Sequence, residues 1–108
     1  MKKGDIWTAS ANADYTGKPR PVVILQDERF LELNSVTVCA FTSVLQETPI
    51  LRLSVEPSRE NGLTQPSQLM VDKITTMPKA KLGKRVGKLG EADRQRLQQA
   101  VLVFLGYT

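Results

Sequence analysis

Hydrophobic residues along most of this chain fall into short runs that have the length of β-strands. Residues 21–26 are almost continuously apolar, which is typical of a strand covered on both faces, whereas residues 50–55 alternate as in a strand with one wet face. Polar residues 10–17 and 56–67 are predicted loops, and the second is long enough to border a binding groove. The predicted strands are Asp5–Ala9, Pro21–Gln26, Val36–Thr42, Ile50–Val55, Gln68–Ile74 and a short last one at Arg85–Leu89.

The hydrophobic period changes near the end of the chain, where residues 91–105 are predicted to form a helix. Glu91 and Asp93 suit its start and Gly106 suits its end. Leu102 and Val103 add apolar surface beside the main stripe, to be buried either in a dimer or deeper in the helix's own core. The stripe itself is Leu97, Ala100, Val101, Phe104 and Leu105. The pattern therefore predicts a mainly β fold, a small antiparallel barrel closed by a C-terminal helix.

Length and composition indicate a single domain over residues 1–108, with an apolar content of 41% and one core. No apolar run follows the lysines at positions 2 and 3, so we expect neither a signal peptide nor a membrane span, and a cytoplasmic location. Cys39, the single cysteine, lies in an apolar run and is expected to be an inert core thiol, with a reactive thiol as the alternative. Trp7 and Phe41 are expected in the core, with base stacking as the alternative.

The chain contains no histidine, which excludes several classes of catalytic site. Nucleophiles activated by histidine, two-histidine nuclease chemistry and most zinc sites are ruled out. The sequence also lacks paired cysteines and a glycine-rich phosphate loop. We therefore expect no metal and no cofactor.

The net charge of +4 is unevenly distributed. Residues 79–88 carry basic side chains and no acidic one, namely Lys79, Lys81, Lys84, Arg85 and Lys88. Such a segment binds nucleic-acid phosphates or an acidic protein segment, or it forms a solvated basic face. Charge alone leaves these three alternatives open.

One arginine lies in an unusually restrained backbone. Pro19 and Pro21 fix the chain on both sides of Arg20, directly before the apolar run of residues 22–25. A guanidinium is always charged and offers donors in a planar fork, which suits phosphate recognition. Arg20 is therefore the first candidate for a functional residue, and a surface donor to nearby carbonyls is the alternative.

Four segments together resemble the PemK/MazF family of toxins. They are Lys3–Trp7, Arg20–Ile24, Cys39–Thr42 and Met70–Thr76, and the resemblance extends over nearly the whole chain. It implies an SH3-like barrel, a homodimer, and the toxin of a toxin-antitoxin pair held by a small acidic antitoxin. It also implies a metal-independent, sequence-specific endoribonuclease that cleaves single-stranded RNA.

The same resemblance assigns site residues. Arg20 and Thr42 match active-site residues of the family, and Asp72 matches an acidic position that contributes in some members. Asp72 has an alternative role as an ion-pair partner of Lys73 or Arg85. Ser43 and Gln68 lie beside these matches without a family counterpart, and we expect them to contact RNA together with Tyr15, Lys18 and Lys73.

The chain departs from the family pattern at three positions. Tyr15 and Pro19 stand where many relatives have a glutamate and some have a histidine, and Met70 stands where some relatives have an arginine. The proton-transfer group is therefore open among Asp72, Asp14 and Tyr15.

The chemistry expected of these groups is attack by the adjacent 2′-hydroxyl on phosphorus, which needs no external nucleophile. Arg20 would pair with the phosphate oxygens and Thr42 would donate a hydrogen bond to them. The alternative from another functional class is a non-enzymatic toxin that resembles CcdB and poisons DNA gyrase by binding it.

Overall fold

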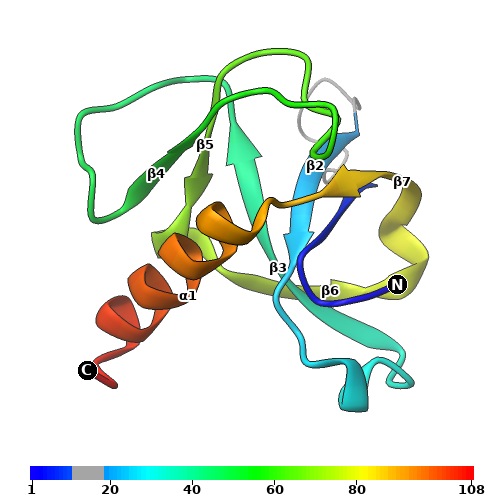
Figure 1. Cartoon of the computed structure of the whole chain (residues 1–108). Coiled ribbons are helices and arrows are strands. Elements are labelled where there is room, and N and C mark those ends of the chain that lie inside the picture. Colours follow the sequence, from blue (N-terminus) through cyan, green and yellow to red (C-terminus); the bar gives the residue numbers. More distant parts are fainter. Residues whose placement is uncertain (11–18) are drawn as a thin grey trace.

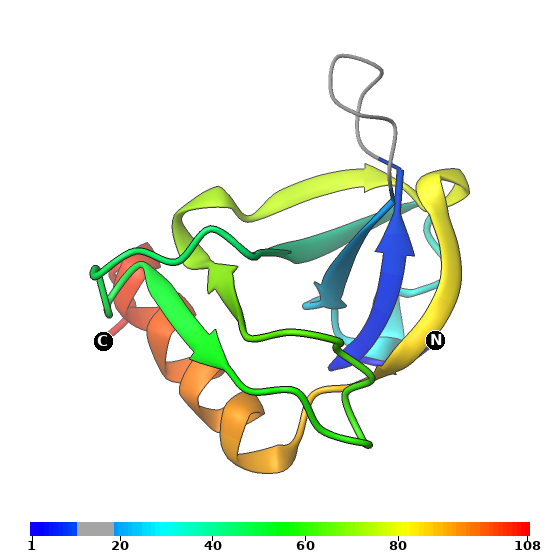
Figure 2. The same cartoon turned by 90° about the horizontal axis from the view of Figure 1, so that it is seen from above.

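A curved antiparallel sheet and one C-terminal helix make up the computed structural model, which describes residues 1–10 and 19–108 (Figures 1 and 2). The strand order is β4-β5-β3-β2-β1-β7, and β6 pairs with β3 beside this path. In chain order the elements are β1 (Asp5–Ala9), β2 (Arg20–Ile24), β3 (Ser35–Thr42), β4 (Arg52–Val55), β5 (Ser67–Met70), β6 (Thr75–Pro78), β7 (Leu82–Lys88) and α1 (Glu91–Leu105). The mainly β fold with a terminal helix is confirmed.

Two predicted elements have the observed bounds, β1 and α1. The helix ends at Gly106, whose φ of 80° is the left-handed conformation that glycine adopts without strain. Strands β2 and β3 differ from their predicted bounds only at their ends. Local hydrophobic period and cap residues were sufficient for these four elements.

The prediction of a strand over residues 68–74 was wrong beyond Met70. The chain leaves the sheet there and forms a short 3-10 helix, Val71–Lys73. Val71 is fully buried and its N–H donates to the carbonyl of Leu51 at 3.0 Å. A tight turn of helix thus brings Val71 into the core without the alternation of a strand.

The remaining differences lie in β4, β6 and β7. Strand β4 begins at Arg52 because residues 49–51 form a turn, in which the N–H groups of Leu51 and Arg52 both donate to Thr48. Strand β6 was not predicted, since its two threonines are exposed and give no apolar run. The basic segment of residues 79–88 forms a 3-10 turn, Lys79–Lys81, followed by β7.

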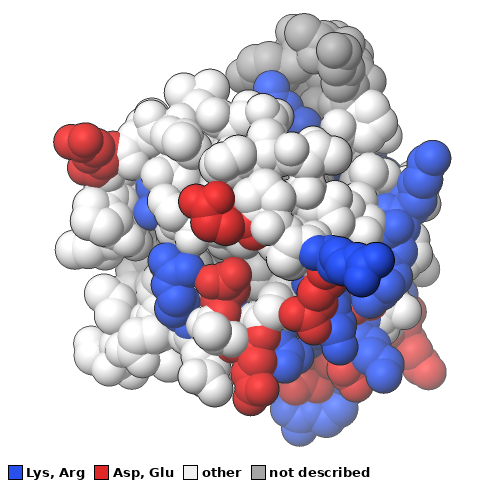
Figure 3. All heavy atoms as spheres, turned by 45° about the horizontal axis from the view of Figure 1, so that its top comes forward, with Lys and Arg blue, Asp and Glu red and all other residues white. Residues whose placement is uncertain are grey.

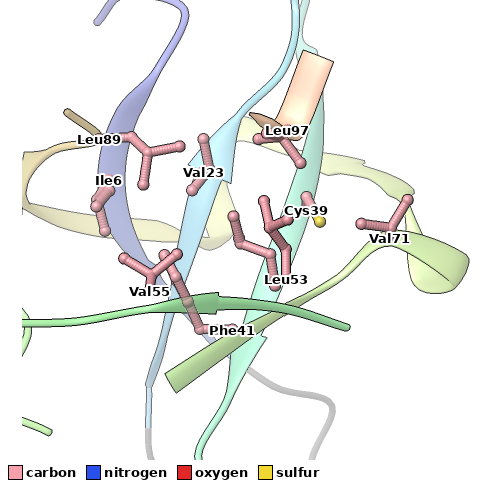
Figure 4. Close-up of a cluster of buried hydrophobic side chains, with 10 residues drawn as sticks. Ile6, Val23, Cys39, Phe41, Leu53, Val55, Val71, Leu89 and Leu97 are labelled. Carbon is pink, nitrogen blue, oxygen red and sulfur yellow. The ribbon is translucent and has the colours of Figure 1, made fainter. Parts of the chain in front are cut away.

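The main core lies between the sheet and α1 (Figure 4). It includes Phe41, which is 1% exposed and is therefore a core residue rather than a stacking platform. Cys39 is fully buried there, and burial, helped by the nearby charge of Asp72, raises the pKa of its thiol to about 12. The thiol is thus protonated and inaccessible, as expected of an inert core residue.

A second apolar cluster fills the other face of β1, β2 and β3. Its buried members are Ala9, Val22, Ile24, Val36 and Val38, and Trp7 packs against them. Trp7 is partly buried, and its Nε1 has no hydrogen-bond partner among the described residues. With apolar clusters on both faces, β2 is the doubly covered strand that its sequence predicted.

The helix uses less of its apolar stripe than predicted. Leu97 is buried and Ala100 and Val101 pack on the core, but Phe104 and Leu105 are 43% and 54% exposed. These two residues lie in the last turn, next to the C-terminus, which Figure 1 shows reaching away from the sheet. Exposed apolar surface therefore collects at the helix end, where no described residue covers it.

The long polar loop after β4 is anchored rather than open. The buried side chain of Asn61 accepts hydrogen bonds from the N–H groups of Ser58 and Leu63 and donates to the carbonyl of Glu56. A Cβ at Gly87 would lie 2.5 Å from the carbonyl oxygen of Glu60, so the loop packs directly on β7.

None of the helices in the described part of the chain has the length and hydrophobicity of a membrane span.

Candidate functional site

The candidate site is a row of polar side chains across one end of the sheet. Thr42 of β3 pairs with Gln68 of β5, which in turn pairs with Ser54 of β4. Opposed residues of an antiparallel sheet point to the same face, and here it is the face opposite to buried Phe41 and Leu69. The row is thus turned away from the main core.

Arg20 begins β2 at the same end. It lies two residues before Val22, and Thr42 lies two residues after Ala40, with Val22 and Ala40 paired. Residues two apart on a strand share a face, so Arg20 and Thr42 lie on the same face of neighbouring strands. Figure 1 shows the start of β2 and the end of β3 at the top of the molecule. The two residues with the clearest family matches are therefore brought to one end of one face.

The two side chains differ in their surroundings. Arg20 is exposed, and no described residue forms an ion pair or side-chain hydrogen bond with it. Thr42 is 9% exposed, and its Oγ1 accepts a hydrogen bond from the N–H of Val44 at 3.1 Å. That bond fixes the hydroxyl and leaves its proton available to donate. Within the described part of the chain, the pair thus offers a cation without an acidic partner beside an oriented O–H donor.

The side-chain amide of Gln68 forms hydrogen bonds within the protein. Its Oε1 accepts from the N–H of Gln46 at 2.9 Å, and its Nε2 donates to the carbonyl of Gln46 at 3.0 Å and to Ser54 Oγ at 3.2 Å. This amide therefore holds the segment of residues 43–51 over the sheet. The predicted RNA contact of Gln68 stays a prediction, but its amide is already engaged.

Below that segment lies a pocket of about 520 Å³. Its lining is Leu45, Gln46, Glu47, Pro49, Arg52, Ser54 and Gln68. The pocket lies beyond Thr42 along the polar row. Gln68 and Gln46, which are joined by two hydrogen bonds, form part of the wall of the pocket. The pocket shares Ser54 and Gln68 with the polar row, and Gln68 is the pairing partner of Thr42.

Asp72 has a partner that the sequence did not indicate. It forms an ion pair with Nη1 of Arg52, a residue of β4 that is 8% exposed, and not with Lys73 or Arg85. Arg85 instead pairs with Asp5 at 3.4 Å. The expected partners of Asp72 were therefore wrong, because β4 and β5 pair so that Arg52 lies opposite Met70, two residues before Asp72.

Arg52 is the residue that sequence analysis missed. The alternation of residues 50–55 placed it on the wet face, yet its side chain is buried and its Nε has no partner among the described residues. One signal in the sequence could have indicated a role for another arginine: Met70 is an apolar residue at a position where some relatives have an arginine. Arg52 supplies a guanidinium from the neighbouring strand at that same position of the sheet.

The other predicted RNA contacts fall into two groups, those that the structure describes and those outside the described residues. Ser43 and Lys73 are exposed, Ser43 directly after Thr42 and Lys73 at the end of the 3-10 helix that carries Asp72. Tyr15, Lys18 and the alternative proton acceptor Asp14 lie outside the described residues. The described residues contain no group of three His, Cys, Asp or Glu side chains arranged to hold a metal ion.

Replacing Gln68 by leucine tests the hydrogen bonds between its side chain and the backbone of Gln46. The change keeps the side-chain volume but leaves the N–H and carbonyl of Gln46 without their partner. We expect a loss of about 1–2 kcal/mol in the free energy of unfolding and faster hydrogen exchange at the amide of Gln46. Urea denaturation and amide exchange measure these effects. Gln65→Leu, at an exposed position just before β5, is the control; equal exchange at Gln46 in both variants would contradict the assignment.

Comparison with known proteins identifies the family. The family model described as PemK-like, MazF-like toxin of type II toxin-antitoxin system matches residues 2–105. A probable endoribonuclease MazF of Mycolicibacterium smegmatis is 52% identical over 98% of this chain and 97% of its own.

Solved structures agree with this result. The Mycobacterium tuberculosis toxin MazF-mt6 superposes with a TM-score of 0.80 at 29% identity, over 94% of this chain and 96% of that one. A mycobacterial endoribonuclease solved in complex with its cognate antitoxin gives a TM-score of 0.81 at 20% identity, over 100% and 97% of the two chains, which supports the shared fold. The chain belongs to the PemK-like and MazF-like toxins of type II toxin-antitoxin systems.

Proposed function

We propose that this toxin is an endoribonuclease that cleaves single-stranded RNA at a phosphate bound by Arg20 and Thr42. The observation that carries the proposal is an arginine without an acidic partner among the described residues, on the same face of neighbouring strands as an oriented hydroxyl. The endoribonuclease name of the 52% identical relative supports RNA cleavage over the alternative of a CcdB-like gyrase poison.

The geometry supports a positioning and electrostatic mechanism. The guanidinium of Arg20 pairs with the non-bridging phosphate oxygens as negative charge builds on them, and the Thr42 hydroxyl donates a further hydrogen bond. The 2′-hydroxyl next to the phosphate attacks phosphorus, which yields a 2′,3′-cyclic phosphate and a free 5′-hydroxyl. No metal ion is needed for this displacement, because the nucleophile belongs to the substrate.

The candidates for the proton-transfer group are those that the sequence analysis named, Asp72, Asp14 and Tyr15. Asp72 is held by Arg52, so we assign it first the task of orienting that arginine beside the pocket, and its action as a base remains a prediction. Asp14 and Tyr15 are the other candidates, and in the sequence both lie between β1 and β2, shortly before Arg20.

The partners proposed are a second copy of the chain and an acidic antitoxin. The exposed apolar end of α1, with Val103, Phe104, Leu105 and Tyr107, supplies surface for a homodimer. A mycobacterial neighbour of the same fold was solved with its cognate antitoxin, and a net charge of +4 suits an acidic partner here. We place the toxin, as a single domain, in the cytoplasm, where messenger RNA is translated.

Incubation of the purified protein with single-stranded RNA in EDTA tests the proposed function. We expect cleavage at defined sites that leaves cyclic phosphate ends, and no cleavage of DNA with the same sequence, because DNA lacks the attacking hydroxyl. A substrate with one 2′-deoxy nucleotide at the cleaved site is the control and should stay intact. Intact RNA under these conditions, or equal cleavage of the deoxy control, would contradict the mechanism.

A further inference from the structure

The basic segment of residues 79–88 divides into two parts with different electrostatic surroundings. At its far end, Arg85 pairs with Asp5 at 3.4 Å and Lys88 lies 3.8 Å from Glu60. At its near end, Lys81 and Lys84 have no acidic partner among the described residues. In the described structure, the basic side chains of this segment that lack an acidic partner therefore lie at and just before the start of β7.

These two lysines lie next to the end of the sheet that carries Arg20. Ala9 of β1 pairs on one side with Arg20 and on the other with Leu82. Lys81 accepts a hydrogen bond from the N–H of Ser10 through its carbonyl, and the N–H of Lys84 donates to Thr8 Oγ1. Because neighbouring strands are about 4.8 Å apart, Arg20 and the start of β7 are separated by about 10 Å at the backbone.

Basic and acidic side chains both reach the surface along the edges of the molecule. In Figure 3 basic side chains gather along the right-hand and lower edges of the molecule, and acidic side chains are interleaved with them mainly toward the lower edge. The anchored loop that contains Glu60 packs against the last part of β7 and not its beginning, since the N–H of Lys88 donates to the carbonyl of Glu60. As far as the described residues go, no acidic side chain pairs with Lys81 or Lys84 at the start of β7, so this part of the edge can meet an anionic ligand.

We propose that Lys81 and Lys84 bind the phosphate backbone of the RNA strand outside the cleaved dinucleotide, as a track that extends from Arg20 over the end of β1 to β7. RNA is favoured over an acidic protein because the lysines are continuous with the residue that binds the cleaved phosphate. The track gives affinity without sequence information, since phosphates are the same at every nucleotide. This inference rests on the proposed RNA-cleaving function.

The test compares a short with a long substrate in the variant Lys81→Gln/Lys84→Gln. A dinucleotide, which carries only the cleaved phosphate, fits the cleavage site alone, whereas a substrate of about 20 nucleotides also reaches β7. We expect unchanged kcat/KM on the short RNA and reduced kcat/KM on the long RNA. Each phosphate contact contributes about 0.7 to the slope of log affinity against log salt, so between 50 and 200 mM salt the wild type should lose about sevenfold more affinity for long RNA than the variant.

The control is Lys2→Gln/Lys88→Gln, which removes the same charge at the opposite end of the β1–β7 pair. An equal loss in this control, or an unchanged salt slope in the Lys81/Lys84 variant, would overturn the track. The track would also be overturned if the Lys81/Lys84 variant lost affinity for the antitoxin while its RNA binding stayed intact. Long-RNA affinity is measured by fluorescence anisotropy with a 2′-deoxy nucleotide at the cleaved site, so the track is tested even if the protein does not cleave RNA.

Discussion

Arg20→Ala should lower RNA cleavage by about a hundredfold to a thousandfold while the protein stays folded, because one pre-organised donor to the reacting phosphate contributes about that much. The side chain is exposed at the first residue of β2, so its removal opens no cavity in either apolar cluster. Single-turnover cleavage of a short RNA measures the loss, and thermal unfolding confirms the fold.

Two further variants separate the arginine's geometry from its charge. Arg20→Lys keeps the charge but loses the planar fork, so we expect an intermediate rate. Arg29→Ala removes an arginine beyond the other end of β2, where an exposed pair with Asp27 contributes little to stability, and should cleave normally. Substantial cleavage by folded Arg20→Ala would remove Arg20 from the site.

Arg20 also shows what could be predicted from sequence. Its two flanking prolines and the apolar run after it are local signals, and local signals were sufficient for β1, β2, β3 and α1. The resemblance of the four short segments then indicated the family and the fold. Thr42 followed from the same source, since nothing in a threonine at a strand end reveals that its hydroxyl is oriented.

The features that were missed all depend on pairing between distant segments. Strand β6 carries exposed threonines and is held by its register with β3. Arg52 is buried because β4 pairs with β5, where it lies opposite Met70 and meets Asp72 from the next turn. The alternation within residues 50–55 does not indicate that Arg52 lies opposite Met70 or that it contacts Asp72. The predicted partners of Asp72 were therefore its sequence neighbour Lys73 and Arg85, which lies on β7.

Asp72→Ala should destabilise the protein by about 2–3 kcal/mol, because it leaves the guanidinium of Arg52 buried without its counter-ion. The side chains of Arg52 and Asp72 are 8% and 28% exposed. The pair of Asp93 with Arg96 on α1 is a matched control, since Asp93 is 27% exposed but its arginine is 48% exposed. Asp93→Ala should therefore cost less than about 1 kcal/mol. Urea denaturation measures both, and equal losses would show that burial of Arg52 is not the cause.

The double variant Arg52→Met/Asp72→Leu then separates structure from chemistry at Asp72. Replacing both charges by apolar side chains removes the unpaired ion, so most of the lost stability should return. If the Arg52–Asp72 pair acts only through stability, cleavage should recover with the fold, with an unchanged pH profile. A double variant that is as stable as the wild type but cleaves RNA only weakly, with a residual rate that lacks the acidic limb of the pH profile, would instead assign Asp72 as the base. This outcome would leave Arg20 and Thr42 as the phosphate clamp and place the proton acceptor at Asp72, with Arg52 setting its orientation.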